Sequence, residues 1–142
     1  MSAKSNHFYI EKNYVNFFNK SEILNSPRTE GIIKRENFLL LAAYGFSIGY
    51  KTPFENNKAK GNDTFVMNQL TNEELALLYA IAISDTKDLE VVNDDVKVAD
   101  IAMEYANTGI IELKKLEENS GKGNRIKTFQ AEILDFIEDF DY

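Results

Sequence analysis

Cysteine and tryptophan are absent from this chain of 142 residues, and histidine occurs only once. Without cysteine there is no disulfide, no thiolate ligand for a metal and no cysteine nucleophile. This composition suits a reducing compartment, and we expect a cytoplasmic protein. The one histidine, His7, precedes a short apolar segment, where we expect an exposed arm residue rather than the base of a catalytic triad.

Long apolar runs are also missing. The first six residues are polar and lack the apolar region of a signal peptide, so none is expected. The longest uncharged stretch, Asn37–Tyr50, has fourteen residues, whereas a membrane-spanning helix needs roughly 20 apolar ones. We therefore expect no membrane partner.

Positive charge is scarce in the second part of the chain. Residues 1–60 carry nine Lys/Arg and five Asp/Glu, a net charge of +4, whereas residues 61–142 carry seven and eighteen, a net charge of −11. An acidic total of −7 disfavours non-specific binding to a phosphate backbone, because that binding relies on Lys and Arg. This total is compatible with a local basic face, and the asymmetry is equally compatible with steering onto a charged protein partner.

Aromatic residues are plentiful, with ten Phe and seven Tyr, and the length fits one domain with a real core. We predict a mainly α, compact single domain over residues 1–142, a helical bundle of about five helices. Phe38–Tyr44 is apolar on every side and is the expected central helix. Phe8–Ile10 indicates a short N-terminal strand or hairpin within an arm over residues 1–12. Asn13 is the expected cap of a short helix after the arm.

Three further helices are indicated. Thr71 and Glu74 form a capping-box pattern before nine apolar residues, Leu75–Ile83. This run predicts a buried helix packed directly on the central one, with Ala76, Ala80 and Ala82 allowing a close approach. Asn93 or Asp94 caps a longer helix with one apolar stripe, and Gly109 in it indicates tight packing or a bend. The stripe consists of Val92, Val96, Ala99, Met103, Ala106, Ile110 and Leu113. The final helix has an apolar side of Ile126, Phe129, Ile133, Phe136, Ile137 and Phe140.

Two polar segments separate these elements. Residues 50–63 predict an exposed basic loop or a loose hairpin, and residues 119–125 predict a linker to the C-terminal helix. Lysine side chains on a mobile loop can reach a phosphate backbone. The candidate nucleic-acid contacts are Lys51, Lys58 and Lys60, and the alternative is a solvated loop.

The remaining motifs that imitate catalytic or metal-binding sites do not indicate an enzyme. The carboxylates over residues 85–95 do not follow the spacing of a calcium-binding loop, so helix capping and solubility are expected of them. Asp95-Val96-Lys97 imitates part of a metal-dependent nuclease site but stands at a helix start, and Glu112-Leu113-Lys114 repeats the pattern within a helix. Gly121-Lys122-Gly123 lacks the spacing of a phosphate-binding loop. We expect no catalytic residue, no cofactor and no metal.

The C-terminal residues 135–142 mix aromatic and acidic side chains. They either dock on their own domain or form a recognition helix for a basic groove on a partner. The candidate partner contacts are Phe136, Glu138, Asp139, Phe140 and Tyr142.

Three segments carry a resemblance to a known family. They are Phe38–Phe46 with Gly49 and Pro53-Phe54, then Leu78–Ile83, then Glu104–Ile110. Over about residues 12–118 the chain resembles small accessory proteins encoded beside bacterial DNA-phosphorothioation modification and restriction genes. The resemblance implies a cytoplasmic, non-enzymatic helper in anti-phage defence that binds a larger ATPase or nuclease subunit. It supplies no active residues to carry over.

Two alternatives stay open. The net charge of −11 in residues 61–142 fits an acidic DNA mimic or inhibitor from a phage or mobile element. Such mimicry needs carboxylates in a row at phosphate-like spacing. The third and least favoured class is a metal-dependent nuclease using Asp95 and Lys97.

Overall fold

The computed structural model describes residues 7–21, 24, 34–55 and 60–119. Four α-helices and two strands follow one another along this part of the chain. They are β1 (His7–Glu11), α1 (Val15–Lys20), α2 (Lys34–Ile48), β2 (Lys60–Val66), α3 (Asn72–Thr86) and α4 (Asp95–Asn119), with 3₁₀ turns at Lys12–Tyr14, Met67–Gln69 and Leu89–Asn93. The mainly α prediction is therefore confirmed. The expected C-terminal helix and its linker lie outside the described residues, apart from Asn119, which ends α4.

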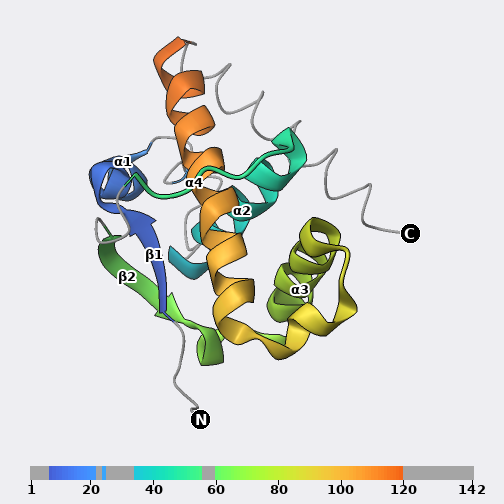
Figure 1. The fold of residues 1–142 in the computed structure, drawn as a ribbon. Helices are drawn as coiled ribbons and strands as arrows, with labels where there is room; N and C mark the ends of the chain where they lie inside the picture. Colours follow the sequence, from blue (N-terminus) through green and yellow to red (C-terminus); the bar gives the residue numbers. More distant parts are fainter. Residues whose placement is uncertain (1–6, 22–23, 25–33, 56–59, 120–142) are drawn as a thin grey trace.

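Helix α4 is the element on which the others pack. It contacts α2 most extensively and also α3 and β1, and Figure 1 shows it passing between the sheet and α3. From Val98 to Ile110 nearly every α4 residue is buried. The predicted stripe is confirmed at Ala99, Met103, Ala106, Ile110 and Leu113. It is wrong at Val96, which is 58% exposed. The stripe is too narrow a description, because neighbouring elements cover α4 on several sides.

Helix α2 is buried as its sequence predicts. Asn37–Leu39 and Leu41–Gly45 are all buried. Gly49 follows the helix with φ of 111°, in the left-handed region that glycine favours. Gly45 is instead inside the helix and faces α4, where it allows the two backbones to approach. The uncharged run therefore belongs to the core, but α4 and not α2 is the element on which the others pack.

Helix α3 begins as predicted but packs differently. The Glu74 N–H donates to Thr71 Oγ1 at 3.1 Å, and the Thr71 N–H donates to Glu74 Oε1 at 2.9 Å, which confirms the capping box. The helix contacts α2, as predicted, but it packs mainly on α4 and is less buried than predicted. Only Leu78, Ile81 and Ala82 are buried, and Ala76 and Ala80 are exposed.

The two strands pair antiparallel, with His7 opposite Val66 and Glu11 opposite Lys60. The N-terminal strand is confirmed, but the loop predicted over residues 50–63 is wrong at its end, since β2 starts at Lys60. Phe8 of β1 stacks on Phe65 of β2 with ring centroids 4.5 Å apart. Both rings meet Phe38 of α2 edge-on at 5.3 Å. The sheet thereby joins the core through aromatic contacts.

Helix α1 is not capped by Asn13. It follows the turn Lys12–Tyr14, and neither element has a side-chain cap at its start. The Asn13 amide instead donates to Glu11 Oε2 at 3.2 Å and to Glu55 Oε1 at 2.7 Å. The capping prediction is wrong because these two carboxylates compete successfully for the Asn13 side chain.

Candidate functional site

The segment after α2, residues 50–55, lies along α4 and is fixed to it. The Thr52 N–H donates to the Glu104 carbonyl at 3.1 Å, and the hydroxyls of Thr52 and Thr108 share a hydrogen bond of 2.7 Å. The Tyr50 hydroxyl donates to Glu112 Oε2 at 3.1 Å. Glu104, Thr108 and Glu112 are four residues apart along α4. They therefore lie on one face of the helix and form a row of hydrogen-bonding partners for this segment. The part of the predicted loop that the structure describes is therefore anchored.

A buried polar cluster joins β1, this segment and α4. The Asn107 side-chain N–H₂ donates to Glu11 Oε1 at 3.0 Å, to the Thr52 carbonyl at 3.1 Å and to the Pro53 carbonyl at 3.3 Å. Glu11 and Asn107 are each 3% exposed. The amide of Asn13 holds the other oxygen of Glu11 and also Glu55. One asparagine thus connects three segments that are far apart in the sequence.

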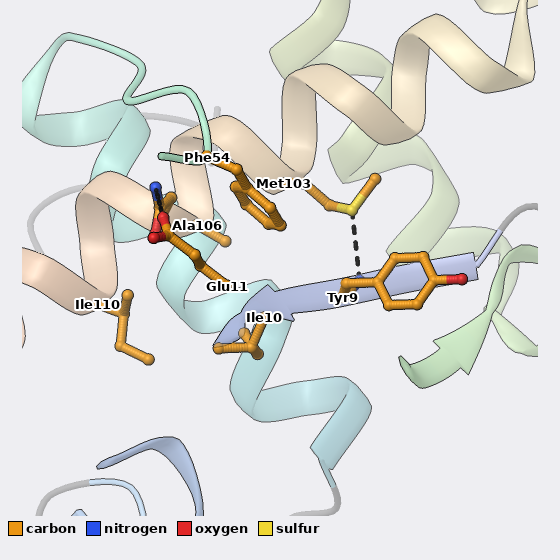
Figure 2. A pocket seen from close by; sticks show the side chains of 8 residues that line it. Tyr9, Ile10, Glu11, Phe54, Met103, Ala106 and Ile110 are labelled. Atoms are coloured by element: carbon orange, nitrogen blue, oxygen red, sulfur yellow. Dashed lines mark hydrogen bonds between the residues drawn. The ribbon is translucent and has the colours of Figure 1, made fainter. Parts of the chain in front are cut away.

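A narrow depression lies beside this cluster (Figure 2). Its lining comes from β1, Phe54 and α4, and consists of Tyr9, Ile10, Glu11, Phe54, Met103, Ala106, Asn107 and Ile110. The Tyr9 backbone N–H points toward Met103 Sδ at 3.3 Å. The depression leaves no room for the centre of a water molecule. It is therefore not a pocket for an organic substrate.

A second polar cluster links residue 51, α3 and α4. Lys51 Nζ forms an ion pair with Asp85 Oδ2 at 2.9 Å, and the Tyr105 hydroxyl donates to Asp85 Oδ1 at 2.8 Å. The Tyr105 ring meets Phe46 of α2 edge-on at 5.2 Å. Asp85 thus fixes the last turn of α3 against α4 and against the segment after α2.

The environment shifts the pKa values in this cluster. Burial alone would raise the pKa of Asp85, but the hydrogen bonds from Lys51 and Tyr105 outweigh it and lower that pKa. Burial, and then the hydrogen bond to the Asp85 carboxylate, raises the pKa of Tyr105 to about 12. Burial also raises the pKa of the neighbouring Glu104. At neutral pH the cluster consists of an ionised Asp85 held by a lysine and a neutral phenol.

The predicted nucleic-acid contacts are not assembled as a group. The Lys51 side chain is engaged with Asp85 and only 34% exposed. Lys60 belongs to β2, opposite Glu11, and Lys58 lies outside the described residues. Contact with DNA through these lysines stays a prediction. The same holds for the predicted partner contacts Phe136, Glu138, Asp139, Phe140 and Tyr142, which lie outside the described residues.

The turn between α3 and α4 and the first turn of α4 expose large apolar side chains among acidic ones. Leu89 is 72% exposed and Val96 is 58% exposed. Exposed carboxylates accompany them at Asp88, Glu90, Asp94 and Asp95. We call these six residues the acidic–apolar surface. The sequence pattern does not reveal its two apolar residues, because the helical period assigns Val96 to the core and Leu89 stands among carboxylates expected only to cap helices and aid solubility.

Some carboxylates of this surface cap local structure, as predicted. Asp88 Oδ1 accepts the N–H of Glu90 at 2.9 Å, and Asp94 Oδ1 accepts the N–H of Lys97 at 3.1 Å at the start of α4. His7 at the start of β1 is exposed, with its ring stacked at 6.1 Å from that of Tyr9. Across the described ranges, no group of three His, Cys, Asp or Glu residues is arranged to hold a metal ion.

The described helices include none with the length and apolar character to cross a bilayer. The chain matches no family model, no curated protein and no solved structure.

Proposed function

We propose that the protein is a non-enzymatic accessory subunit that binds a larger protein through its acidic–apolar surface. The observation that carries the proposal is the exposure of Leu89 and Val96 at 72% and 58%. Other branched aliphatic residues of α4, such as Val98, Ile101 and Ile110, are at most 5% exposed. Large apolar groups that stay in water next to a well-filled core are typical of interaction sites.

The chemistry of this surface fits a basic partner. Leu89 and Val96 supply apolar anchors, and Asp88, Glu90, Asp94 and Asp95 supply negative charge in the same span, partly offset by the exposed Lys87 and Lys97. Apolar residues at the centre of an interface carry most of the affinity, whereas rim charges govern orientation and the association rate. A matching partner presents an apolar recess bordered by lysine or arginine side chains.

The family resemblance supports the kind of partner. It favours a cytoplasmic ATPase or nuclease subunit of a bacterial defence system linked to DNA phosphorothioation. A basic surface would be expected on a subunit that handles DNA, because such proteins carry clustered Lys and Arg. In this proposal the protein adjusts or stabilises the larger subunit and has no catalytic centre of its own.

Co-purification from the native host tests the proposal. The full chain carries a tag, and the captured proteins are identified by mass spectrometry. We expect a large defence subunit with the wild-type protein and a loss of at least about tenfold with the double variant Leu89→Ser, Val96→Ser, since each side chain contributes as a buried anchor. Tyr50→Ser is the matched control. Tyr50 is also a large exposed side chain, at 50%, but it lies in the segment after α2 and not in the acidic–apolar surface. Recovery of the wild-type protein alone and monomeric would contradict the proposal, as would equal capture by the double variant.

The charged rim has a separate kinetic test. Asp95→Lys reverses one exposed charge without removing an apolar anchor. We expect slower association with the captured subunit and little change in the dissociation rate, with the difference fading at high salt. Surface plasmon resonance at two ionic strengths measures both rates. A salt-independent loss would place the effect in the fold rather than in electrostatic steering.

A further inference from the structure

Helix α3 carries more apolar surface than the core takes up. All nine residues from Leu75 to Ile83 are apolar, yet Leu78, Ile81 and Ala82 are the only ones that are buried. The helix stands at the edge of the described fold, on the side of α4 away from the sheet (Figure 1). A helix at the surface normally has one apolar face and one polar face. The apolar residues of α3 outside its buried face are only partly covered.

Four of these residues form a second apolar face, which we call the outer side of α3. They are Ala76, Tyr79, Ala80 and Ile83, at the spacing i, i+3, i+4 and i+7 that puts side chains on one face of a helix. At about 100° per residue, this face lies nearly opposite the buried one. Ala76 and Ala80 are exposed, and Tyr79 and Ile83 are half-buried. The outer side contains no charged residue, and apolar surface of this kind marks a contact site.

The C-terminal part of the sequence contains a segment that matches the outer side. The apolar side predicted for residues 126–140 has the same helical spacing and consists of phenylalanine and isoleucine. These side chains are large, whereas Ala76 and Ala80 are small, and large side chains of one helix pack closely over small ones of another. We propose that residues 126–140 form a helix that packs on the outer side of α3.

The chain is long enough to make this contact. Helix α4 ends at Asn119, and the Tyr105 hydroxyl, fourteen residues earlier, donates to Asp85 in the last turn of α3. At 1.5 Å per residue, α4 rises about 21 Å between Tyr105 and Asn119. The predicted linker, residues 119–125, spans up to about 23 Å when extended, which brings the chain back to the level of Asp85. A helix over residues 126–140 has the same fifteen residues as α3 and can run beside its whole length.

A tethered segment has an advantage over a separate molecule. A short flexible linker holds its segment at an effective concentration on the order of millimolar. A second copy of the chain, or another protein, would have to reach that concentration to occupy the outer side instead. Packing on α3 would remove Phe136 and Phe140 from the predicted partner contacts and would leave the acidic–apolar surface for the partner. The contact is internal to the chain and does not depend on the proposed function.

Chemical cross-linking of the full chain tests the contact directly. Because the protein has no cysteine, two introduced thiols are the only ones present. Ala80→Cys places one thiol on the outer side of α3, and the second is moved along the C-terminal segment, one variant at a time. With a short bis-maleimide we expect linked monomer at apolar positions and several-fold less at matched polar positions. The apolar set is Phe129→Cys, Ile133→Cys and Phe136→Cys, and the polar set is Thr128→Cys, Glu132→Cys and Asp135→Cys.

Hydrogen exchange of the full chain gives a readout without introduced thiols. The double variant Phe129→Ser, Phe136→Ser removes two large side chains of the apolar side, and Thr128→Ser, Asp135→Ser is the matched control. In the first variant we expect the backbone amides of α3 to exchange about tenfold faster, because an uncovered helix opens more readily, while those of β1 stay as in the wild type. The control should exchange like the wild type throughout.

Four results would overturn the proposal. Links only between two molecules would make a second copy the occupant of the outer side. Links without preference for the apolar positions would show that no defined face of the segment meets α3. Unchanged exchange of α3 in the Phe129→Ser, Phe136→Ser variant would show that these side chains do not cover it. Equally faster exchange of α3 and β1 would indicate a loss of global stability instead of a lost cover on α3.

Discussion

Gly45 of α2 and Gly109 of α4 face each other where the two helices cross. A Cβ added to Gly45 would lie 3.0 Å from the Gly109 backbone nitrogen and would overlap the Tyr105 carbonyl group. A Cβ added to Gly109 would overlap the Leu41 carbonyl in the same way. Each helix therefore gives up a side chain so that the two backbones touch. Glycine has a low helix propensity, so each of these residues destabilises its helix. The close packing that they permit compensates for that loss of stability.

Gly45→Ala should destabilise the protein by about 3 kcal/mol, because a methyl group cannot fit without moving one helix and overpacking is typically this costly. Urea unfolding followed by circular dichroism measures the change. Gly49→Ala is the comparison: nothing lies within 4 Å of its added Cβ, but its φ of 111° is strained for alanine. We expect a cost there of about 1–2 kcal/mol. An equal or smaller cost at Gly45 would show that the α2–α4 crossing is not tight.

Tyr105→Phe should cost about 1–2 kcal/mol at neutral pH, because it removes a hydrogen bond to the Asp85 carboxylate. The pKa of Tyr105 is raised from 10.0 to about 12, so the protonated phenol favours the folded state. Its contribution is fully present below pH 10 and is lost as the pH rises toward 12. The free energy of unfolding at several alkaline pH values, compared between the two proteins, measures this. A difference that stays constant from pH 8 to 12 would count against the assigned role.

Asp85→Asn should show the opposite pH dependence. The pKa of Asp85 is lowered from 3.8, so its ionised form favours folding, and its contribution is present above that value and lost as the pH falls through the lower folded pKa. At pH 7 we expect a cost of about 1 kcal/mol, as for a partly exposed ion pair. The two proteins should converge in stability under strongly acidic conditions. Lys51→Met tests the same pair from the other side and should show non-additivity with Asp85→Asn in a double-mutant cycle.

Thr71→Ala should destabilise the protein by about 1 kcal/mol, because it removes the oxygen that accepts the Glu74 N–H at the start of α3. Thr71→Ser keeps that oxygen and is the matched control. Since only Leu78, Ile81 and Ala82 of α3 are buried, its start is expected to depend on the cap more than that of a fully buried helix would. Hydrogen exchange at the first turn of α3 should accelerate in the alanine variant and not in the serine variant.

Local patterns along the sequence predict several elements correctly. The capping box at Thr71, the apolar core of α2 and the strand at Phe8–Ile10 each follow from neighbouring residues, and local rules are enough for them. Apolar runs do not reveal which side of a helix has a neighbour. Leu75–Ile83 therefore reads as buried, whereas α3 borders the core on one side only.

The features that local patterns do not predict depend on contacts between residues far apart in the sequence. Asn13 reads as a helix cap because Glu55, which takes its amide, lies 42 residues further along. Lys51 reads as a free basic residue because Asp85 is 34 residues away. Glu11 and Asn107, the centre of the buried cluster, are 96 residues apart, and no local pattern marks either one as a buried polar residue. These hydrogen bonds and ion pairs cannot be predicted from neighbouring residues, because the partners meet only in the folded structure.

The pairing of β1 with β2 has a consequence for the order in which the chain can fold. Close to 50 residues separate the two strands, so closing this loop costs more entropy than a local hairpin would. During synthesis β1 leaves the ribosome before its partners, because Phe8 contacts Phe38 and Phe65 and the Tyr9 N–H contacts Met103, all of which are made later. An apolar strand without a partner is open to misassociation throughout that interval. Strand β1 is thus made well before the residues that shield it from solvent.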